Sequence, residues 1–283
     1  MPITLHRGGV QTRIRIRQGN EWGKSGSALL DTGSSKIVIA ARLLPASAMV
    51  EPQYDAIVHF LARRIRARVV QCELELEMGG VSLPLNLLQV AVIEDSARLP
   101  NGVDAVMGMC SPLRVMTPTA TFVDAYCVSC FEFNIYRRVL KLHASRRECA
   151  IPLLSPDQLA IVDSTSTNAH YALPTDRWPR VVFDTGANVS VVPSHDTALI
   201  LDEQMLDLSN AVTWSQVTRI NDGDGIGVVL GMDTLRAMDV LHFERSVEDP
   251  STWGIVLQAH YLRWGFSQST CSPARSARVA TSS

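Results

Sequence analysis

Hydrophobic and polar residues alternate along much of this chain, and this alternation predicts β-strands separated by short turns. Between residues 11 and 18, Ile14 and Ile16 share one face of the predicted strand, while three arginines share the other. Further segments of this kind span residues 64–70, 72–78 and 85–92. Long stretches with the period of an amphipathic helix are scarce. The sequence therefore predicts an all-β fold with a few short helices.

Two segments of the chain repeat one design, in which an apolar strand, an Asp-Thr-Gly triplet, a small residue and a second apolar strand follow each other. They span residues 28–39 and 181–193. The residues at their centres are Asp31, Thr32, Gly33 and Ser34 in the first segment, and Asp184, Thr185, Gly186 and Ala187 in the second.

A second element also occurs twice. Two apolar residues precede Gly108 after the first triplet, and two precede Gly231 after the second. Four ordered elements in two matching pairs indicate an internal duplication of a structural unit.

These paired elements resemble the pepsin-like aspartic proteases, and also the retroviral-type proteases, which are single-lobe versions of the same half. The resemblance covers most of residues 1–266 and includes the segments 229–231, 239–244 and 254–257. It implies two pseudo-twofold-related lobes, each a distorted β-barrel, with a structural glycine (Gly108 or Gly231) behind each active-site loop. We expect the lobes at residues 1–150 and 151–268, and a disordered tail at 269–283.

The resemblance also implies an aspartic endopeptidase that hydrolyses peptide bonds without a metal or other cofactor. Two carboxyl groups held close together cannot both ionise easily, so one can act as a base towards water while the other acts as an acid. Asp31 and Asp184 are the expected catalytic pair, and the resemblance implies that Thr32 and Thr185 bond across the axis and hold the two loops together. The expected substrate is a polypeptide in an extended conformation, and a monomer is sufficient because one chain carries both loops.

The chain departs from the pepsin-like pattern in two places. Ala187 lacks the hydroxyl that this position often supplies to its aspartate, which predicts a raised pKa and an activity optimum less acidic than that of gastric pepsins. The expected flap, a hairpin near residues 58–76, contains no tyrosine, and Val38 takes the position of its tryptophan partner. Phe60 or Tyr54 is expected to cover the site instead.

Arg64 and Arg66 alternate with apolar residues in this hairpin. Two interpretations stay open: they face the substrate cleft and favour acidic substrates, or they lie on a solvated outer face. The solvated face is the more frequent outcome for arginine.

Composition adds few constraints on partners. The 283 residues carry a formal net charge of -2, which gives no electrostatic argument for binding nucleic acid or a membrane. No apolar run is long enough to cross a bilayer, and no secretory signal begins the sequence. These features favour an intracellular location without naming a compartment.

Of the six cysteines, Cys127 and Cys130 form a C-x-x-C pair. Its possible roles are a zinc site with Cys110 and Cys149, a redox pair, or buried thiols on a strand; the last is the most frequent. Two functional alternatives also stay open: a non-catalytic binding protein of the pepsin fold, and a polyprotein-processing protease of viral or retroelement origin.

Overall fold

The structure, a computed structural model, is mostly β and describes most of the N-terminal half of the chain and shorter parts of the C-terminal half. The described residues are 1–6, 8–34, 36–48, 54–60, 63–109, 122–143, 159–163, 181–193, 195, 197–201, 204–213, 215–217, 228–245 and 253–259.

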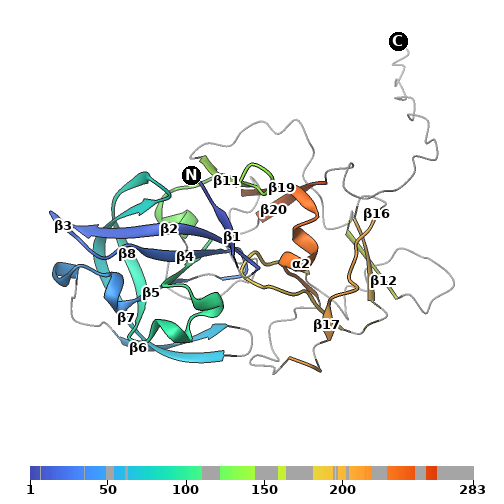
Figure 1. The fold of residues 1–283 in the computed structure, drawn as a ribbon, viewed down its shortest axis with the longest axis horizontal. Helices are drawn as coiled ribbons and strands as arrows, with labels where there is room; N and C mark the ends of the chain where they lie inside the picture. The colour runs from blue at the N-terminus through green and yellow to red at the C-terminus, as the bar shows by residue number, and fades with distance from the viewer. Residues whose placement is uncertain are drawn as a thin grey trace, which may run out of the picture.

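Six strands of the N-terminal half close into a barrel, because the last of them, β7, pairs back onto the first, β2. Their order around the barrel is β2 (Gly9–Gln18), β4 (Gly26–Asp31), β9 (Ala105–Gly108), β5 (Ile37–Ala40), β8 (Val81–Ile93) and β7 (Arg63–Met78). Three further strands extend this sheet: β1 (Thr4–His6), β3 (Glu21–Trp22) and β6 (Tyr54–Phe60). Figure 1 shows the barrel on one side of the molecule, with β12, β16, β17 and α2 on the other.

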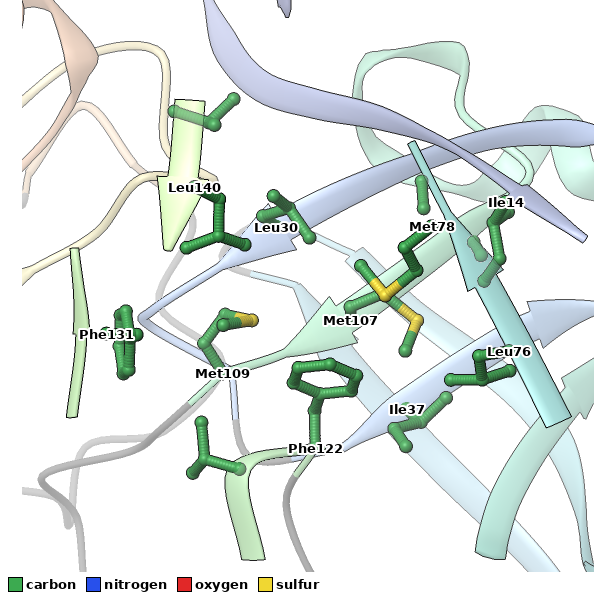
Figure 2. Close-up of a cluster of buried hydrophobic side chains, with 14 of the residues drawn as sticks. Ile14, Leu30, Ile37, Leu76, Met78, Met107, Met109, Phe122, Phe131 and Leu140 are labelled. Carbon is green, nitrogen blue, oxygen red and sulfur yellow. The ribbon is translucent and has the colours of Figure 1, made fainter. Parts of the chain in front are cut away.

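The barrel interior is packed with aliphatic side chains and methionines. Figure 2 shows Leu30, Ile37 and Met107 facing Leu76 and Met78 across it. The same cluster continues through Met109 and Phe122 to Phe131 and Leu140, which lie outside the barrel. One continuous core thus connects the barrel to the strands beside it.

Strands β4, β5 and β9 are buried on both faces, which explains why their sequences are apolar throughout instead of alternating. Leu30 and Met107 point into the barrel, while Leu29, Val38 and Val106 point outwards into a second cluster. The hairpin of β6 and β7 contributes to this outer cluster, as do Leu99 and Val103. The catalytic candidate Asp31 therefore ends a strand that is fixed from both sides.

A second set of strands repeats the pairing found around Asp31. In the barrel, β4 pairs parallel with β9, β9 antiparallel with β5, and β5 parallel with β8. After residue 180, β13 (Val181–Phe183), β18 (Val228–Leu230), β14 (Val191–Val192) and β17 (Val212–Thr213) pair in the same order and with the same three orientations.

A four-stranded antiparallel sheet combines segments from both halves of the sequence. Its order is β11 (Val139–His143), β10 (Cys130–Asn134), β19 (Met238–Arg245) and β20 (Trp253–Ala259). Phe131 of β10 stacks on Phe243 of β19 with ring centroids 4.7 Å apart. The N-terminal residues lie against β11, since Pro2 forms an antiparallel bridge with Val139 and Leu140 N donates to Met1 O at 2.8 Å.

The remaining elements are short. A three-stranded sheet contains β12 (Leu159–Asp163), β15 (Thr197–Leu201) and β16 (Gln204–Met205). The helices are α1 (Phe122–Ala125) and α2 (Met232–Leu235), with helical turns η1 (Ala41–Leu43), η2 (Ala46–Ala48), η3 (Ser96–Arg98) and η4 (Pro100–Gly102). No helix in the described part of the chain is both long and apolar enough to cross a membrane.

The prediction of a mostly β chain with few, short helices is confirmed. Two predicted strands, at 64–70 and 72–78, are one continuous strand, β7. The expected boundary at residues 150 and 151 and the tail at 269–283 lie outside the described residues.

Candidate active site

Each Asp-Thr-Gly loop begins where a buried strand ends. Asp31 is the last residue of β4 and lies opposite Gly108 of β9. Asp184 follows β13, and its backbone N–H donates to Leu230 O of β18 at 2.9 Å. Both aspartates therefore extend from the same position in two equivalent strand pairs.

The two predicted structural glycines allow these strand pairs to approach their loops. A Cβ atom at Gly108 would lie 2.5 Å from Lys36 N, and one at Gly231 would lie 2.5 Å from the carbonyl carbon of Val189. Lys36 and Val189 are each the fifth residue after an aspartate. Backbone cannot move away as a flexible side chain can, so any side chain at either glycine would displace the loop.

The structure brings the two carboxyl groups together. A Cβ atom at Gly33 would lie 2.5 Å from Asp184 Cγ, and one at Gly186 would lie 2.5 Å from Asp31 Cγ. Each carboxyl group thus lies against the glycine of the other loop, and each acts on the pKa of the other.

Thr32 and Thr185 join the two loops reciprocally. The N–H of Thr32 donates to Thr185 Oγ1 at 3.2 Å, and the N–H of Thr185 donates to Thr32 Oγ1 at 3.1 Å. Each hydroxyl donates in turn across the contact, Thr32 to Phe183 O at 2.5 Å and Thr185 to Leu30 O at 2.6 Å. Both threonines are buried, so these hydrogen bonds are shielded from solvent. They hold the two loops, and with them the two aspartates, at a fixed separation.

The two carboxyl groups differ in their hydrogen-bond donors. Asp31 accepts from Gly33 N at 2.8 Å and from the Ser34 hydroxyl at 2.7 Å, one bond to each oxygen. Asp184 accepts from Gly186 N at 2.8 Å and Ala187 N at 3.0 Å, both at Oδ1. No hydroxyl among the described residues donates to Asp184.

Because their donors differ, the two carboxyl groups are expected to have different pKa values. Burial raises the pKa of Asp31 above its ordinary value, while bonds from Ser34, Asp184 and the loop backbone oppose the rise. The pKa of Asp184 is raised much further by burial, by the negative charge of Asp31 and by the bond to it, against only two backbone donors. Asp184 therefore keeps a proton at a pH where Asp31 is ionised.

The hairpin of β6 and β7 occupies the expected flap region, and Phe60 pairs with Arg63 at its end. Phe60 is partly buried, and it is joined by apolar packing to the outer cluster that contains Val38. The side chain of Tyr54 lies outside the described residues.

Arg64 and Arg66 are exposed, on the face of β7 opposite the buried Ile65 and Ala67. Since Ile65 and Ala67 pack on the outer cluster next to Leu29, the arginines point away from that cluster. Both arginines thus lie on a solvent-exposed face of the hairpin, opposite its apolar face.

Two contacts at the second loop were not expected from the sequence. Asn101 Nδ2 donates to Gly186 O at 3.4 Å. The buried Ser190 hydroxyl donates to Asp233 Oδ1 at 2.7 Å, and Asp233 also accepts from Ser190 N at 3.0 Å. The sequence contains a signal only for Asn101, which lies in a Pro-Asn-Gly turn of the kind that permits a left-handed backbone.

Cys72 and Cys127 are free thiols, and Cys110 and Cys149 lie outside the described residues. Cys130 is buried on β10, as expected. Cys127 is exposed with a left-handed backbone (φ 51°), so the prediction of a buried thiol is wrong there. Within the described residues, no group of three or more His, Cys, Asp or Glu side chains could hold a metal ion.

Comparison with known proteins adds no relative: no family model matches this chain, and no curated protein matches it.

Proposed function

We propose that this chain is an aspartic-type endopeptidase that hydrolyses peptide bonds of an extended polypeptide with Asp31 and Asp184. The observation that supports the proposal most strongly is the pair of adjoining carboxyl groups with raised and unequal pKa values. A pair in which one group is ionised and the other protonated can transfer protons in both directions at one pH.

The difference in hydrogen-bond donors indicates which carboxyl group acts as the base and which acts as the acid. Asp31, the more easily ionised, takes a proton from water as the water oxygen attacks the peptide carbonyl carbon. Asp184 donates its proton to the carbonyl oxygen, which gives a tetrahedral intermediate with two hydroxyl groups. The C–N bond then breaks as Asp31 passes its proton to the leaving nitrogen, and Asp184 regains a proton from a hydroxyl of the intermediate.

The repeated strand pairing supports a bilobal, pepsin-like arrangement in which two related halves each contribute one loop. The β4–β9–β5–β8 and β13–β18–β14–β17 sets have the same orientations, and their glycines contact the same position of each loop. Since one chain provides both aspartates, we propose that a monomer is the active form.

The test is cleavage of a denatured protein between pH 3 and pH 7, with and without a pepstatin-type inhibitor. We expect Asp31→Asn and Asp184→Asn each to lower kcat/KM by about 10²–10⁴-fold, the usual contribution of one acid–base group. Asp95→Asn is the matched control, because Asp95 is an exposed aspartate outside the flap hairpin, and asparagine can replace it as the cap of η3 and should leave the rate unchanged.

Cleavage that survives both loop substitutions would exclude this dyad as the catalytic group. If the folded chain cleaves nothing yet binds peptides, the non-catalytic binding alternative replaces the proposal.

A further inference from the structure

The peptide unit between Gly186 and Ala187 is held from both of its sides. Its N–H, on Ala187, donates to Asp184 Oδ1 at 3.0 Å. Its carbonyl, on Gly186, accepts from Asn101 Nδ2 at 3.4 Å. Because a trans peptide is planar, its C=O and N–H point in opposite directions, and fixing one orients the other.

Asn101 is well placed to hold this carbonyl. Its backbone is left-handed (φ 56°, ψ 12°), a conformation that Asn adopts more readily than most residues. The residues on either side of the turn, Leu99 and Val103, are buried in the outer cluster and anchor it. A Cβ atom at Gly9 would lie 3.0 Å from Asn101 Nδ2, so the absence of a side chain at Gly9 leaves room for the carboxamide.

The contact matters because Asp184 has few donors. Asp31 receives the hydroxyl of Ser34, whereas Ala187 can offer Asp184 only its backbone N–H. A donor at the far carbonyl also polarises the peptide unit and strengthens its N–H as a donor.

We propose that Asn101 is a positioning residue for Asp184, acting through the Gly186–Ala187 peptide to aim a donor at the carboxylate. The expected effect of Asn101 on the reaction rate rests on the proposed function, whereas its expected effect on the titration of Asp184 does not. Among the described residues, Asp31 is the charged group that acts on Asp184. Asp104, close to Asn101 in sequence, pairs with Arg42 and accepts from Ser27.

Asn101→Gly is the informative variant, because glycine accepts the left-handed backbone and only the carboxamide is lost. Arg138→Gly is its matched control: Arg138 is exposed and also left-handed (φ 53°), and it lies on the turn before β11 with no hydrogen bond to the described residues of either Asp-Thr-Gly loop. Asn101→Asp provides a second variant of nearly the same shape, which cannot donate when ionised.

The experiment follows the Asp carboxyl carbons by NMR from pH 3 to pH 8, with the Asp184 signal assigned by its loss in Asp184→Asn. We expect the pKa of Asp184 to rise in Asn101→Gly, to rise further in Asn101→Asp, and to stay unchanged in Arg138→Gly. In parallel, kcat should fall about 2- to 10-fold in Asn101→Gly with KM little changed, and the alkaline limb of the rate profile should move to higher pH.

An Asp184 titration in Asn101→Gly that is identical to that of the unmodified chain would overturn the inference, whether or not the chain is active. A shifted titration in a chain without peptidase activity would instead support the positioning role and reject the proposed function. If Asn101→Gly does not fold, the titration of Asn101→Asp decides.

Discussion

At the scale of single residues, the two carboxyl groups differ in the hydrogen-bond donor supplied by the third residue after each aspartate. Ser34 provides a hydroxyl to Asp31, while Ala187 is buried among Val182, Val191 and Val229 and provides only a backbone N–H. A donor to the charged form lowers a pKa, so its loss keeps Asp184 protonated to higher pH. This difference adds to burial and to the negative charge of Asp31 in keeping Asp184 protonated, and the proposed acid and base roles follow from these effects together.

Replacing Ala187 by serine should therefore move the activity optimum. If the new hydroxyl reaches the carboxylate as that of Ser34 does, the pKa of Asp184 falls and the alkaline limb of the kcat/KM profile moves to lower pH. The measurement is the pH–rate profile of Ala187→Ser against that of the unmodified chain.

Ser34→Ala is the reciprocal control. It removes a donor from Asp31, which should raise the pKa of that group and move the acidic limb to higher pH. Profiles that do not change in either variant would show that these hydroxyl positions have no influence on the pair.

At the scale of structural elements, the two loops depend on the reciprocal threonine contact. Thr185→Val removes the acceptor of Thr32 N–H and leaves this buried N–H without its partner. We expect a loss of about 1–3 kcal/mol in the free energy of unfolding, the usual cost of a buried unsatisfied donor. Urea unfolding monitored by fluorescence or circular dichroism measures it.

Thr185→Ser is the control, since it keeps the hydroxyl and removes only a methyl group. It should retain most of the stability that Thr185→Val loses. Equal destabilisation by both substitutions would assign the effect to packing and not to the hydrogen bonds.

Strand β7 contributes buried side chains to both hydrophobic clusters, the outer cluster and the barrel interior. Ile65 and Ala67 belong to the outer cluster, whereas Val70 and Cys72 belong to the barrel interior. The buried positions change from odd to even residue numbers at Val69 and Val70, where two neighbouring residues are both buried. This change of phase explains why the sequence pattern predicted two strands.

At the scale of the whole molecule, the buried carboxyl groups affect stability. Both pKa values are raised above the ordinary value of 3.8, so the folded chain binds more protons than the unfolded chain between that value and the folded values. Across this window the free energy of unfolding falls as pH rises. The stabilisation is complete below the unfolded pKa and is lost as pH rises through the folded pKa.

Asp184→Asn should remove most of this dependence, because the amide cannot ionise next to Asp31. We expect a higher Tm than that of the unmodified chain at pH 7, by about 2–4 °C for each kcal/mol of repulsion relieved. The difference should shrink towards pH 3, and calorimetry at several pH values measures it. A Tm difference that is constant with pH would contradict the assignment of raised pKa values.

The sequence by itself determined the mostly β fold, most of the strands around the barrel and the two loops that provide the candidate site. Local rules are sufficient for these features, since strand alternation and the Asp-Thr-Gly triplets extend over only a few residues. The glycines behind the loops were also predictable, because the same short element occurs twice.

Only the tertiary structure decided how these parts meet. The resemblance implied the bonds between Thr32 and Thr185, which lie 153 positions apart in the chain, but nothing in the sequence indicated that Asn101 contacts a carbonyl 85 positions further on. The outward direction of Arg64 and Arg66 likewise depends on which face of β7 packs against Leu29 and Val38. Such contacts arise from the packing of distant strands, and the local pattern of hydrophobic and polar residues carries no information about them.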